Sequence, residues 1–254
     1  MTLLEVSGVG KRFGGLQAVR DVSFRVRKGS VKAVIGPNGA GKTTLFHLVS
    51  GVLAPDAGAI TLRGRAIHGL ASHQVAALGL SRTFQHIRLF AHMTALENVM
   101  VGCHVRSRAG FLAGMLHLPW TWAEEAGIRR RARELLELVG IADLAGAEAT
   151  SLSYGQQRAV ELARALASDP ELLLLDEPAA GLNMRETADV AGLISRIRAR
   201  GVTVLLVEHD MSLVMGICDE VVVLSFGEKI ADADPASVQR DPDVVRVYLG
   251  DEEC

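Results

Sequence analysis

The sequence predicts an α/β fold with a largely parallel sheet, a region of short strands near the N-terminus and an inserted helical subdomain. Four apolar runs show no alternation, as do strands buried on both faces of a parallel sheet: Val31–Ile35, Leu172–Leu175, Val202–Val207 and Val221–Leu224. Amphipathic helical patterns lie between these runs, which is typical of α/β domains. Leu3–Arg65 instead holds short alternating or β-branched segments between glycines, which predicts short strands.

The helical patterns are bounded by recognisable stop signals. Glu124–Val139 and Glu186–Arg200 each place their apolar residues on one face, and Gly140 and Gly201 follow them. Glycine is common just past a helix end. Residues 92–167 carry no strong strand pattern, which indicates a mainly helical subdomain inserted into the α/β core. Its least regular piece, Gly102–Trp122, is interpreted as an insert.

Composition narrows the class of protein. The 254 residues fit one large domain or two small ones, at roughly 100–200 residues per domain. With 27 Lys+Arg against 29 Asp+Glu and a net charge of -2, there is no electrostatic reason to expect nucleic acid as the main partner. No apolar run approaches the roughly 18–20 residues of a spanning helix. The first residues lack the order of a signal peptide, and the three cysteines lack metal spacing. We therefore expect a cytoplasmic protein.

Residues 36–44 read GPNGAGKTT and match the phosphate-loop pattern G-x-x-x-x-G-K-[ST]. The strand-like VKAVI precedes the match and the helical LFHLVSG follows it, which disfavours a chance glycine-rich turn. Glycines let consecutive N–H groups point at phosphate oxygens, and a helix beginning at Lys42 adds its positive dipole end. Lys42 can reach the β- and γ-phosphates, and the Thr43 hydroxyl can ligate Mg²⁺. The predicted nucleotide-binding residues are Gly36, Pro37, Asn38, Gly39, Ala40, Gly41, Lys42, Thr43 and Thr44.

Asp176 and Glu177 close the apolar strand in LLLLDEP. The carboxyl end of a parallel strand is where open α/β sheets bind ligands, so Asp176 is a candidate Mg²⁺ partner and Glu177 can polarise an attacking water. The alternative is an exposed acidic pair at a strand end, which becomes the minority interpretation beside a phosphate loop. Together the two motifs predict a nucleoside triphosphatase or a kinase.

Four further segments resemble motifs of the ATP-binding cassette (ABC) ATPases, in the right order over essentially the whole chain. Gln85 in RTFQHIRLF resembles the Q-loop glutamine, and His209 in VLLVEHDM resembles the switch histidine. AAGLN, ending at Asn183, resembles the D-loop. LSYGQQR resembles the signature motif and contributes Ser153, Tyr154, Gly155 and Gln156.

The resemblance implies a single ABC cassette over residues 1–254. Residues 1–91 and 168–254 would form a P-loop nucleotide-binding core, with a mixed or parallel sheet and an antiparallel β subdomain. Residues 92–167 would form the helical signature subdomain. The resemblance also implies a head-to-tail dimer of cassettes that sandwiches two ATP molecules, so that one chain offers its phosphate loop to one ATP and its signature helix to the other.

The same resemblance assigns roles in ATP hydrolysis. Thr43, Gln85 and Asp176 would hold Mg²⁺, while Lys42 balances phosphate charge. Glu177 would act as general base, and His209 would contact the γ-phosphate and the attacking water. Hydrolysis would open the dimer, and the Gln85 region would pass the motion to a membrane partner.

The resemblance leaves two alternatives open at each of Phe13, Ser153 and Asn183, and it meets a departure at Tyr154. Phe13 in KRFGG would stack on adenine where the family often has Tyr, or it could be a buried core residue. Tyr154 stands where the family has Gly and is expected to point away from the phosphates, whereas Ser153 could bind phosphate or be a plain helix cap. Asn183 replaces the usual D-loop Asp, so it could hydrogen-bond across a dimer or cap the next helix.

Within the family, the chain most resembles the ATPase subunits of branched-chain amino-acid importers. The matching stretches include RFGGLQAV, RTFQHIRLFAHMTALENV, the Gly-Phe-Leu insert near Phe111, DEPAAGLN and DPDVVRVYLG. This implies a second ATPase subunit, in a homodimer or heterodimer, two membrane permeases and, indirectly, a periplasmic solute-binding protein. It places the chain on the inner face of the cell membrane.

Other assignments remain open at this point. The solute could be an amide or urea, or the system could export lipopolysaccharide. A non-transport ABC ATPase acting on ribosomes or DNA would usually carry two cassettes or a coiled-coil insertion. A non-catalytic regulatory module would have no use for Glu177 and His209, and a P-loop kinase would have none for LSYGQ.

Overall fold

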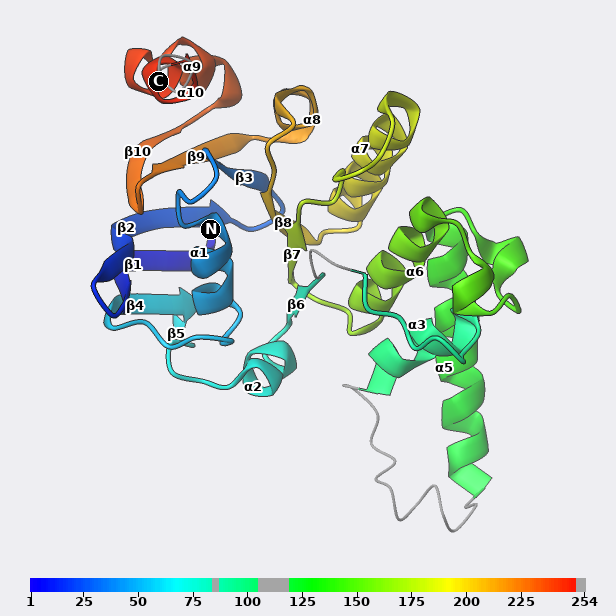
Figure 1. Cartoon of the computed structure of the whole chain (residues 1–254). Helices are drawn as coiled ribbons and strands as arrows, with labels where there is room; N and C mark the ends of the chain where they lie inside the picture. Colours follow the sequence, from blue (N-terminus) through cyan, green and yellow to red (C-terminus); the bar gives the residue numbers. More distant parts are fainter. Residues whose placement is uncertain (84–86, 105–118, 250–254) are drawn as a thin grey trace. The chain divides into compact units, whose positions relative to one another are not determined.

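The computed structural model describes residues 1–83, 87–104 and 119–249, which belong to two compact units. The first unit joins Met1–Arg82 to the chain from Glu171 onward, and the second is Thr83–Pro170. The second unit therefore begins before residue 92, where the sequence suggested its start. Figure 1 shows the strands of the first unit and the helices of the second.

The first unit contains an antiparallel sheet with the strand order β2-β1-β4-β5. The strands are β1 (Thr2–Phe13), β2 (Leu16–Arg27), β4 (Ala57–Leu62) and β5 (Arg65–Ala66). Val22, Phe24 and Val26 of β2 are buried and alternate with exposed neighbours, as expected for a sheet with one covered face. The short strands predicted in this region are confirmed.

A second, six-stranded sheet has the order β10-β9-β3-β8-β7-β6. Its strands are β3 (Val31–Ile35), β6 (Leu80–Arg82), β7 (Leu172–Asp176), β8 (Thr203–Val207), β9 (Glu220–Ser225) and β10 (Glu228–Ala233). Adjacent strands are parallel except for the antiparallel β9–β10 pair. Every residue of β3, β7 and β8 is buried, which confirms strands covered on both faces. The sequence pattern did not predict β6, because three residues are too few to show periodicity.

The helices of the first unit complete its core. They are α1 (Lys42–Val49), α2 (Ser72–Ala77), α7 (Met184–Ala199), α8 (Met211–Ile217), α9 (Pro235–Arg240) and α10 (Pro242–Leu249). Leu45 and Phe46 of α1 are fully buried in one apolar cluster with residues of both sheets, so α1 is anchored between them. Gly201 follows α7 with φ 87°, which confirms the predicted helix end.

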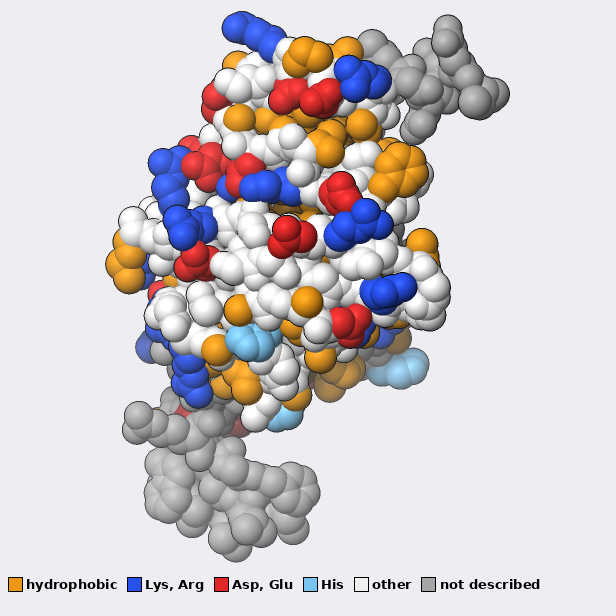
Figure 2. Space-filling view, turned by 90° about the vertical axis from the view of Figure 1, so that its left-hand side faces the viewer, with side chains coloured by type: hydrophobic (Ala, Val, Ile, Leu, Met, Phe, Trp, Pro, Cys, Tyr) orange, Lys and Arg blue, Asp and Glu red, His pale blue; other side chains and the backbone are white. Residues whose placement is uncertain are grey.

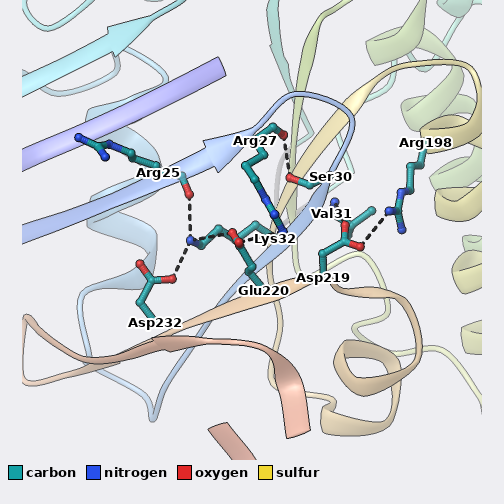
Figure 3. Close-up of polar contacts among 9 residues, drawn as sticks. All are labelled: Arg25, Arg27, Ser30, Val31, Lys32, Arg198, Asp219, Glu220 and Asp232. Atoms are coloured by element: carbon teal, nitrogen blue, oxygen red, sulfur yellow. Dashed lines mark hydrogen bonds and ion pairs between the residues drawn. The ribbon is translucent and has the colours of Figure 1, made fainter. Parts of the chain in front are cut away.

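One residue departs from the apolar pattern of the parallel strands. Lys32 of β3 is buried, and its Nζ lies 2.7 Å from Asp232 and 3.3 Å from Glu220. The same Nζ donates to the carbonyl oxygen of Arg25 at 2.8 Å, as Figure 3 shows. A buried ammonium group is tolerated when carboxylates and a carbonyl replace its water. The charge cluster lies where β3 begins, at the end away from the phosphate loop.

Within its described residues, the second unit contains α3 (Ala95–Cys103), α5 (Pro119–Leu138) and α6 (Tyr154–Ala167), and short 3₁₀ turns at Ala142–Leu144 and Ala149–Ser151. The predicted helix at Glu124–Val139 thus begins earlier. A Cβ on Gly102 would lie 2.2 Å from the carbonyl oxygen of Arg164, so a glycine is needed where α3 meets α6. The interpretation of Gly102–Trp122 as one insert was too broad, because α3 and α5 take up its two ends. Residues 105–118, with Phe111, lie outside the described residues.

The surface of the first unit carries charges of both signs. Exposed ion pairs join Arg25 to Glu5 at 2.7 Å and Arg20 to Glu228 at 2.8 Å. Figure 2 shows basic and acidic side chains interspersed over one face, in keeping with the net charge of -2. Such exposed pairs add little stability. Among the helices that the structure describes, none has the length and apolar character needed to cross a membrane.

Candidate nucleotide-binding and hydrolysis site

The phosphate loop joins the end of β3 to the start of α1. Gly36 has φ 147°, and a Cβ there would lie 2.1 Å from the carbonyl oxygen of Leu224. Gly41 has φ 96°, and its Cβ would lie 2.4 Å from the carbonyl oxygen of Ala18. Only glycine fits such left-handed positions against neighbouring backbone. The glycines predicted to shape the loop are therefore required sterically at Gly36 and Gly41.

The N-terminus of α1 is left open toward the loop. The helix begins at Lys42, as predicted, and Gly41 provides no side-chain cap, nor does the first turn carry an acidic residue. Its first N–H groups are therefore available to an anion. Thr43 is exposed, Thr44 is partly exposed, and Asn38 and Gly39 form the exposed tip of the loop. Pro37 is partly exposed and Ala40 is buried.

Lys42 folds back into the loop that it follows. Its Nζ donates to the carbonyl oxygens of Gly36 at 2.7 Å and Pro37 at 2.9 Å. Burial lowers the pKa of Lys42, while the negative charges of Glu177 and Asp176 act in the opposite direction. Both carboxylates thus favour the charged form of the ammonium group, and phosphate oxygens would favour it further.

Asp176 is the last residue of β7, and its side chain is buried. Its Oδ2 accepts a hydrogen bond from Nη2 of Arg82 at 2.7 Å, and Nη1 of Arg82 reaches Oγ of Ser50 at 3.1 Å. Burial is the main cause that lowers the pKa of nearby His47, and Arg82 lowers it further. The predicted metal-binding carboxylate is therefore paired with a largely buried arginine from β6.

Glu177 follows β7 in an unusual backbone conformation. Its φ is 49°, and its N–H donates to the carbonyl oxygen of Val207 at 3.0 Å. A left-handed conformation costs a non-glycine residue about 1–2 kcal/mol. Such strain persists only where the surroundings impose it, and it clusters at functional sites. The strained residue is the one that the sequence predicts to be the general base.

His209 lies just beyond β8, the strand next to β7. Its side chain is 63% exposed, whereas that of the preceding Glu208 is fully buried. Nδ1 of His209 lies 3.9 Å from Oε2 of Glu208. Asp210 then caps α8 by accepting the N–H groups of Ser212 and Leu213. The histidine is therefore presented to solvent from a fixed backbone at the carboxyl end of the parallel strands.

Phe13 ends β1 and is 46% exposed, so it is not a core residue. Lys11 Nζ lies 5.8 Å from the centroid of its ring. The alternative of a buried phenylalanine is therefore wrong, and the ring is exposed at the surface, as stacking on a base requires.

The signature segment starts α6 in the helical unit. Ser153 caps this helix: its Oγ accepts the N–H of Gln156 at 3.4 Å, and its own N–H donates to Oε1 of Gln156 at 2.9 Å. Tyr154 and Gly155 occupy the first helical positions. Tyr154 has its hydroxyl 3.2 Å from Nη2 of Arg158, one turn further along the helix. Ser153 is thus a cap, and Tyr154 adopts a helical conformation that needs no glycine.

Asn183 caps α7 in the same way. Its Oδ1 accepts the N–H groups of Arg185 at 3.0 Å and Glu186 at 3.1 Å, and its N–H donates to Oε2 of Glu186 at 2.9 Å. The amide oxygen is therefore engaged within its own chain. Of the two interpretations left open for Asn183, the cap is the one present here.

The first unit thus brings the phosphate loop, Asp176 and Glu177 together at one end of the parallel strands, with His209 on the adjacent strand end. Gln85 lies outside the described residues. Two contributors escaped the sequence analysis: Arg82, in a strand too short to detect, and Glu208. The pattern that predicts a site at Asp176, an acidic residue at the end of an apolar strand, is also present at Glu208.

This arrangement defines a P-loop nucleotide-hydrolase cassette, and comparison with known proteins agrees. Residues 19–180 match the family model described as ABC transporter. The chain therefore belongs to the ABC transporter ATP-binding family, whose general activity is ATP hydrolysis. Residues 228–254 match a second model, described as branched-chain amino acid ATP-binding cassette transporter.

Individual proteins of this family are similar to the chain over nearly its whole length. The high-affinity branched-chain amino acid transport ATP-binding protein LivG of Salmonella typhimurium is 45% identical over 250 residues, or 98% of each chain. The corresponding protein BraF of Pseudomonas aeruginosa is 46% identical with the same coverage. A solved ATP-binding cassette of an ABC transporter in its ADP conformation has a TM-score of 0.86 and 32% identity, covering 98% of this chain and 99% of that one. The predicted ABC cassette fold is confirmed.

Proposed function

We propose that this chain is the ATP-hydrolysing subunit of an ABC importer for branched-chain amino acids. The observation that carries the proposal is 45–46% identity, over 98% of each chain, to two branched-chain amino acid transport ATP-binding proteins. The chain would act with a second ATPase subunit, identical or different, and two membrane permeases. A periplasmic binding protein would deliver the solute, and the chain would sit on the inner face of the membrane.

The phosphate loop would bind the triphosphate of ATP. The open N-terminus of α1 and the backbone N–H groups of the loop favour phosphate oxygens. Lys42 would exchange its two carbonyl partners for β- and γ-phosphate oxygens. Phe13 would stack on the adenine ring through its exposed face.

The side chains near the loop also suit Mg²⁺, a hard cation that prefers oxygen ligands. Thr43 offers an exposed hydroxyl on the first turn of α1, and Asp176 offers a buried carboxylate at the end of β7. Gln85 is the third predicted ligand. Bound there, Mg²⁺ would neutralise charge on the phosphate oxygens.

Hydrolysis would depend on Glu177 and His209. The carboxylate of Glu177 would accept a proton from the water that attacks the γ-phosphorus, as the bond from that phosphorus to the leaving oxygen of ADP breaks. His209 would donate a hydrogen bond to a γ-phosphate oxygen. This contact would keep the γ-phosphate in line with the attacking water. Lys42 would balance the charge on the transferred group.

The signature segment would serve the nucleotide bound by the second cassette. Ser153 and Gly155 lie at the N-terminus of α6, where a hydroxyl and N–H groups can meet an anion. Since one Ser153 lone pair already accepts the N–H of Gln156, its hydroxyl hydrogen is the group offered to phosphate. Gln156 would support this serine through the capping box.

A transport assay tests the proposal. Uptake of labelled leucine is measured in cells that lack this chain, then with the wild-type chain or Glu177→Gln restored at matched protein levels. We expect wild-type alone to restore uptake, while uptake of labelled glutamate stays unchanged throughout. Unchanged leucine uptake in the deletion strain, with loss of urea or amide uptake or of lipopolysaccharide export instead, would reject the substrate assignment.

A further inference from the structure

Glu208 is a buried carboxylate that the mechanism above leaves without a role. It directly follows β8, and its side chain is 0% exposed. Among the residues that the structure describes, neither a lysine nor an arginine forms an ion pair with it. A buried charge is costly unless donors replace its water. Its hydrogen-bond donors therefore indicate what the residue does.

Three backbone N–H groups from two segments supply these donors. Oε1 of Glu208 accepts the N–H of Ala179 at 2.9 Å. Oε2 accepts the N–H of His209 at 3.0 Å and that of Asp210 at 3.3 Å. Hydrogen bonds to an ionised acceptor are about twice as strong as neutral ones. The two carboxylate oxygens thus link the segment after Glu177 to the segment that begins at His209.

The backbone reinforces this link. The N–H of Glu177 donates to the carbonyl oxygen of Val207 at 3.0 Å, and the N–H of Glu208 donates to that of Val34 at 3.4 Å. Glu177 is therefore held against the end of β8 at its own N–H and, two residues later, through Ala179. Its left-handed φ of 49° requires such support from its surroundings.

We propose that Glu208 is a positioning residue for ATP hydrolysis, which bridges Ala179 and His209 and so fixes the Glu177 carboxylate and the His209 imidazole relative to each other. This inference rests on the proposed function, because it assigns those two side chains to the reaction. Glu208 acts through its neighbours and does not touch nucleotide. A displacement of about 1 Å in a catalytic group can cost about 100-fold in rate.

The first test is Glu208→Gln in the assembled transporter. Glutamine has only one side-chain oxygen, so it can accept hydrogen bonds from only one of the two segments. Its NH₂ group would face the backbone N–H groups of the other segment, and the bridge would be lost there. We expect kcat for ATP hydrolysis to fall about 10- to 100-fold. The affinity for trinitrophenyl-ATP should remain within about twofold, because the phosphate loop is not touched. A parallel loss of affinity and rate, or an unchanged kcat, would overturn the proposal.

Asp219 provides a matched control at the other end of the parallel strands. Its Oδ2 accepts the N–H of Val31 at 2.8 Å, and its Oδ1 accepts Nη2 of Arg198 at 2.8 Å, as Figure 3 shows. It too is a carboxylate that bridges two segments. We expect Asp219→Asn to lower thermal stability and leave kcat within about twofold. An equal loss of kcat in this variant would overturn the proposal, because the loss would then not be specific to the carboxylate beside Glu177 and His209.

A double-mutant comparison tests whether Glu208 acts on the rate through Glu177 or by weakening the fold in general. In the Glu177→Gln background, Glu208→Gln should lower the residual rate by clearly less than it lowers the wild-type rate, because one of the two groups that it positions, the Glu177 carboxylate, is already absent. Multiplicative losses would overturn the proposal. If Glu208→Gln does not fold, Glu208→Asp serves instead, since the shorter side chain cannot reach both segments. Hydrolysis by the wild-type transporter is measured first. If the wild type does not hydrolyse ATP, the proposed function fails; if it does and Glu208→Gln leaves kcat unchanged, only this inference fails.

Discussion

The phosphate-loop end of the first unit and the signature segment of the second are built in different ways. Several constraints fix the conformation of the first. Gly36 lies against the backbone of β9, Asp176 is paired with a largely buried arginine, and Glu177 is held at a strained φ. The signature segment is an ordinary capping box at the start of a helix, with Ser153 and Tyr154 exposed. Under the proposed function, one chain would fix the geometry of catalysis in its core and would offer its signature segment to a partner cassette.

The two regions differ in how strongly their structure indicates a ligand-binding role. Strain, buried charge and steric need for glycine are costly features that a fold keeps where function requires them. A capping box is stabilising by itself and needs no ligand to account for it. The two regions should consequently respond differently to substitution, and the following variants test that contrast.

Of the variants that compare the two regions, the one in the phosphate loop should have the largest effect. Gly36→Ala places a Cβ 2.1 Å from the carbonyl oxygen of Leu224, and relieving that clash costs about 1–3 kcal/mol or more. We expect ATP affinity to fall about tenfold to 100-fold, measured with a fluorescent ATP analogue. Gly29→Ala is the control, because Gly29 also has a left-handed φ, of 76°, but nothing lies within 4 Å of its Cβ position. Equal affinity in the two variants would show that the loop is not sterically constrained.

An intermediate effect is expected at the signature segment. Ser153→Ala and Thr94→Ala each remove an N-cap from a capping box in the helical unit, at a cost of about 1 kcal/mol. If Ser153 also binds phosphate, its variant alone should lose about tenfold in ATP hydrolysis by the assembled transporter, the scale of one lost hydrogen bond to a charged group. Equal stability losses with equal hydrolysis rates would leave Ser153 as a cap only.

The smallest effect is expected at Asn183. Asn183→Ala removes the acceptor of two N–H groups of α7, at a cost of about 1 kcal/mol, or a fall of about 2–4 °C in Tm. Asn183→Asp keeps the cap and should melt like the wild type. Thermal denaturation distinguishes them, and a melt of Asn183→Asp as low as that of the alanine variant would contradict the capping role.

The sequence was informative where local pattern and function coincide. The start of α1 at Lys42, the doubly buried strands and the helix end before Gly201 follow from short-range rules of glycine, periodicity and dipole. The same rules placed Asp176 and Glu177 at the end of β7. These features depend on neighbours within a few residues, so a linear pattern reveals them.

Other features depend on contacts between distant residues. Arg82 pairs with Asp176 across 94 positions, and Glu208 accepts the N–H of Ala179 across 29. Lys32 interrupts an apolar strand, and only the fold brings Glu220 and Asp232 to it. For Ser153 and Asn183 the capping geometry was foreseen only as one of two alternatives, because a cap and an anion site use the same residue types.

The most direct test of the account is ATP hydrolysis by the transporter purified with its partners, comparing the wild-type chain with Glu177→Gln while nucleotide binding is measured in parallel. We predict equal binding, an ATP-trapped dimer of cassettes and a loss of about 100-fold or more in the variant's rate, since a general base contributes on this scale. Full turnover by Glu177→Gln, or its loss of ATP binding, would contradict the assignment of Glu177 as the base on which this site depends.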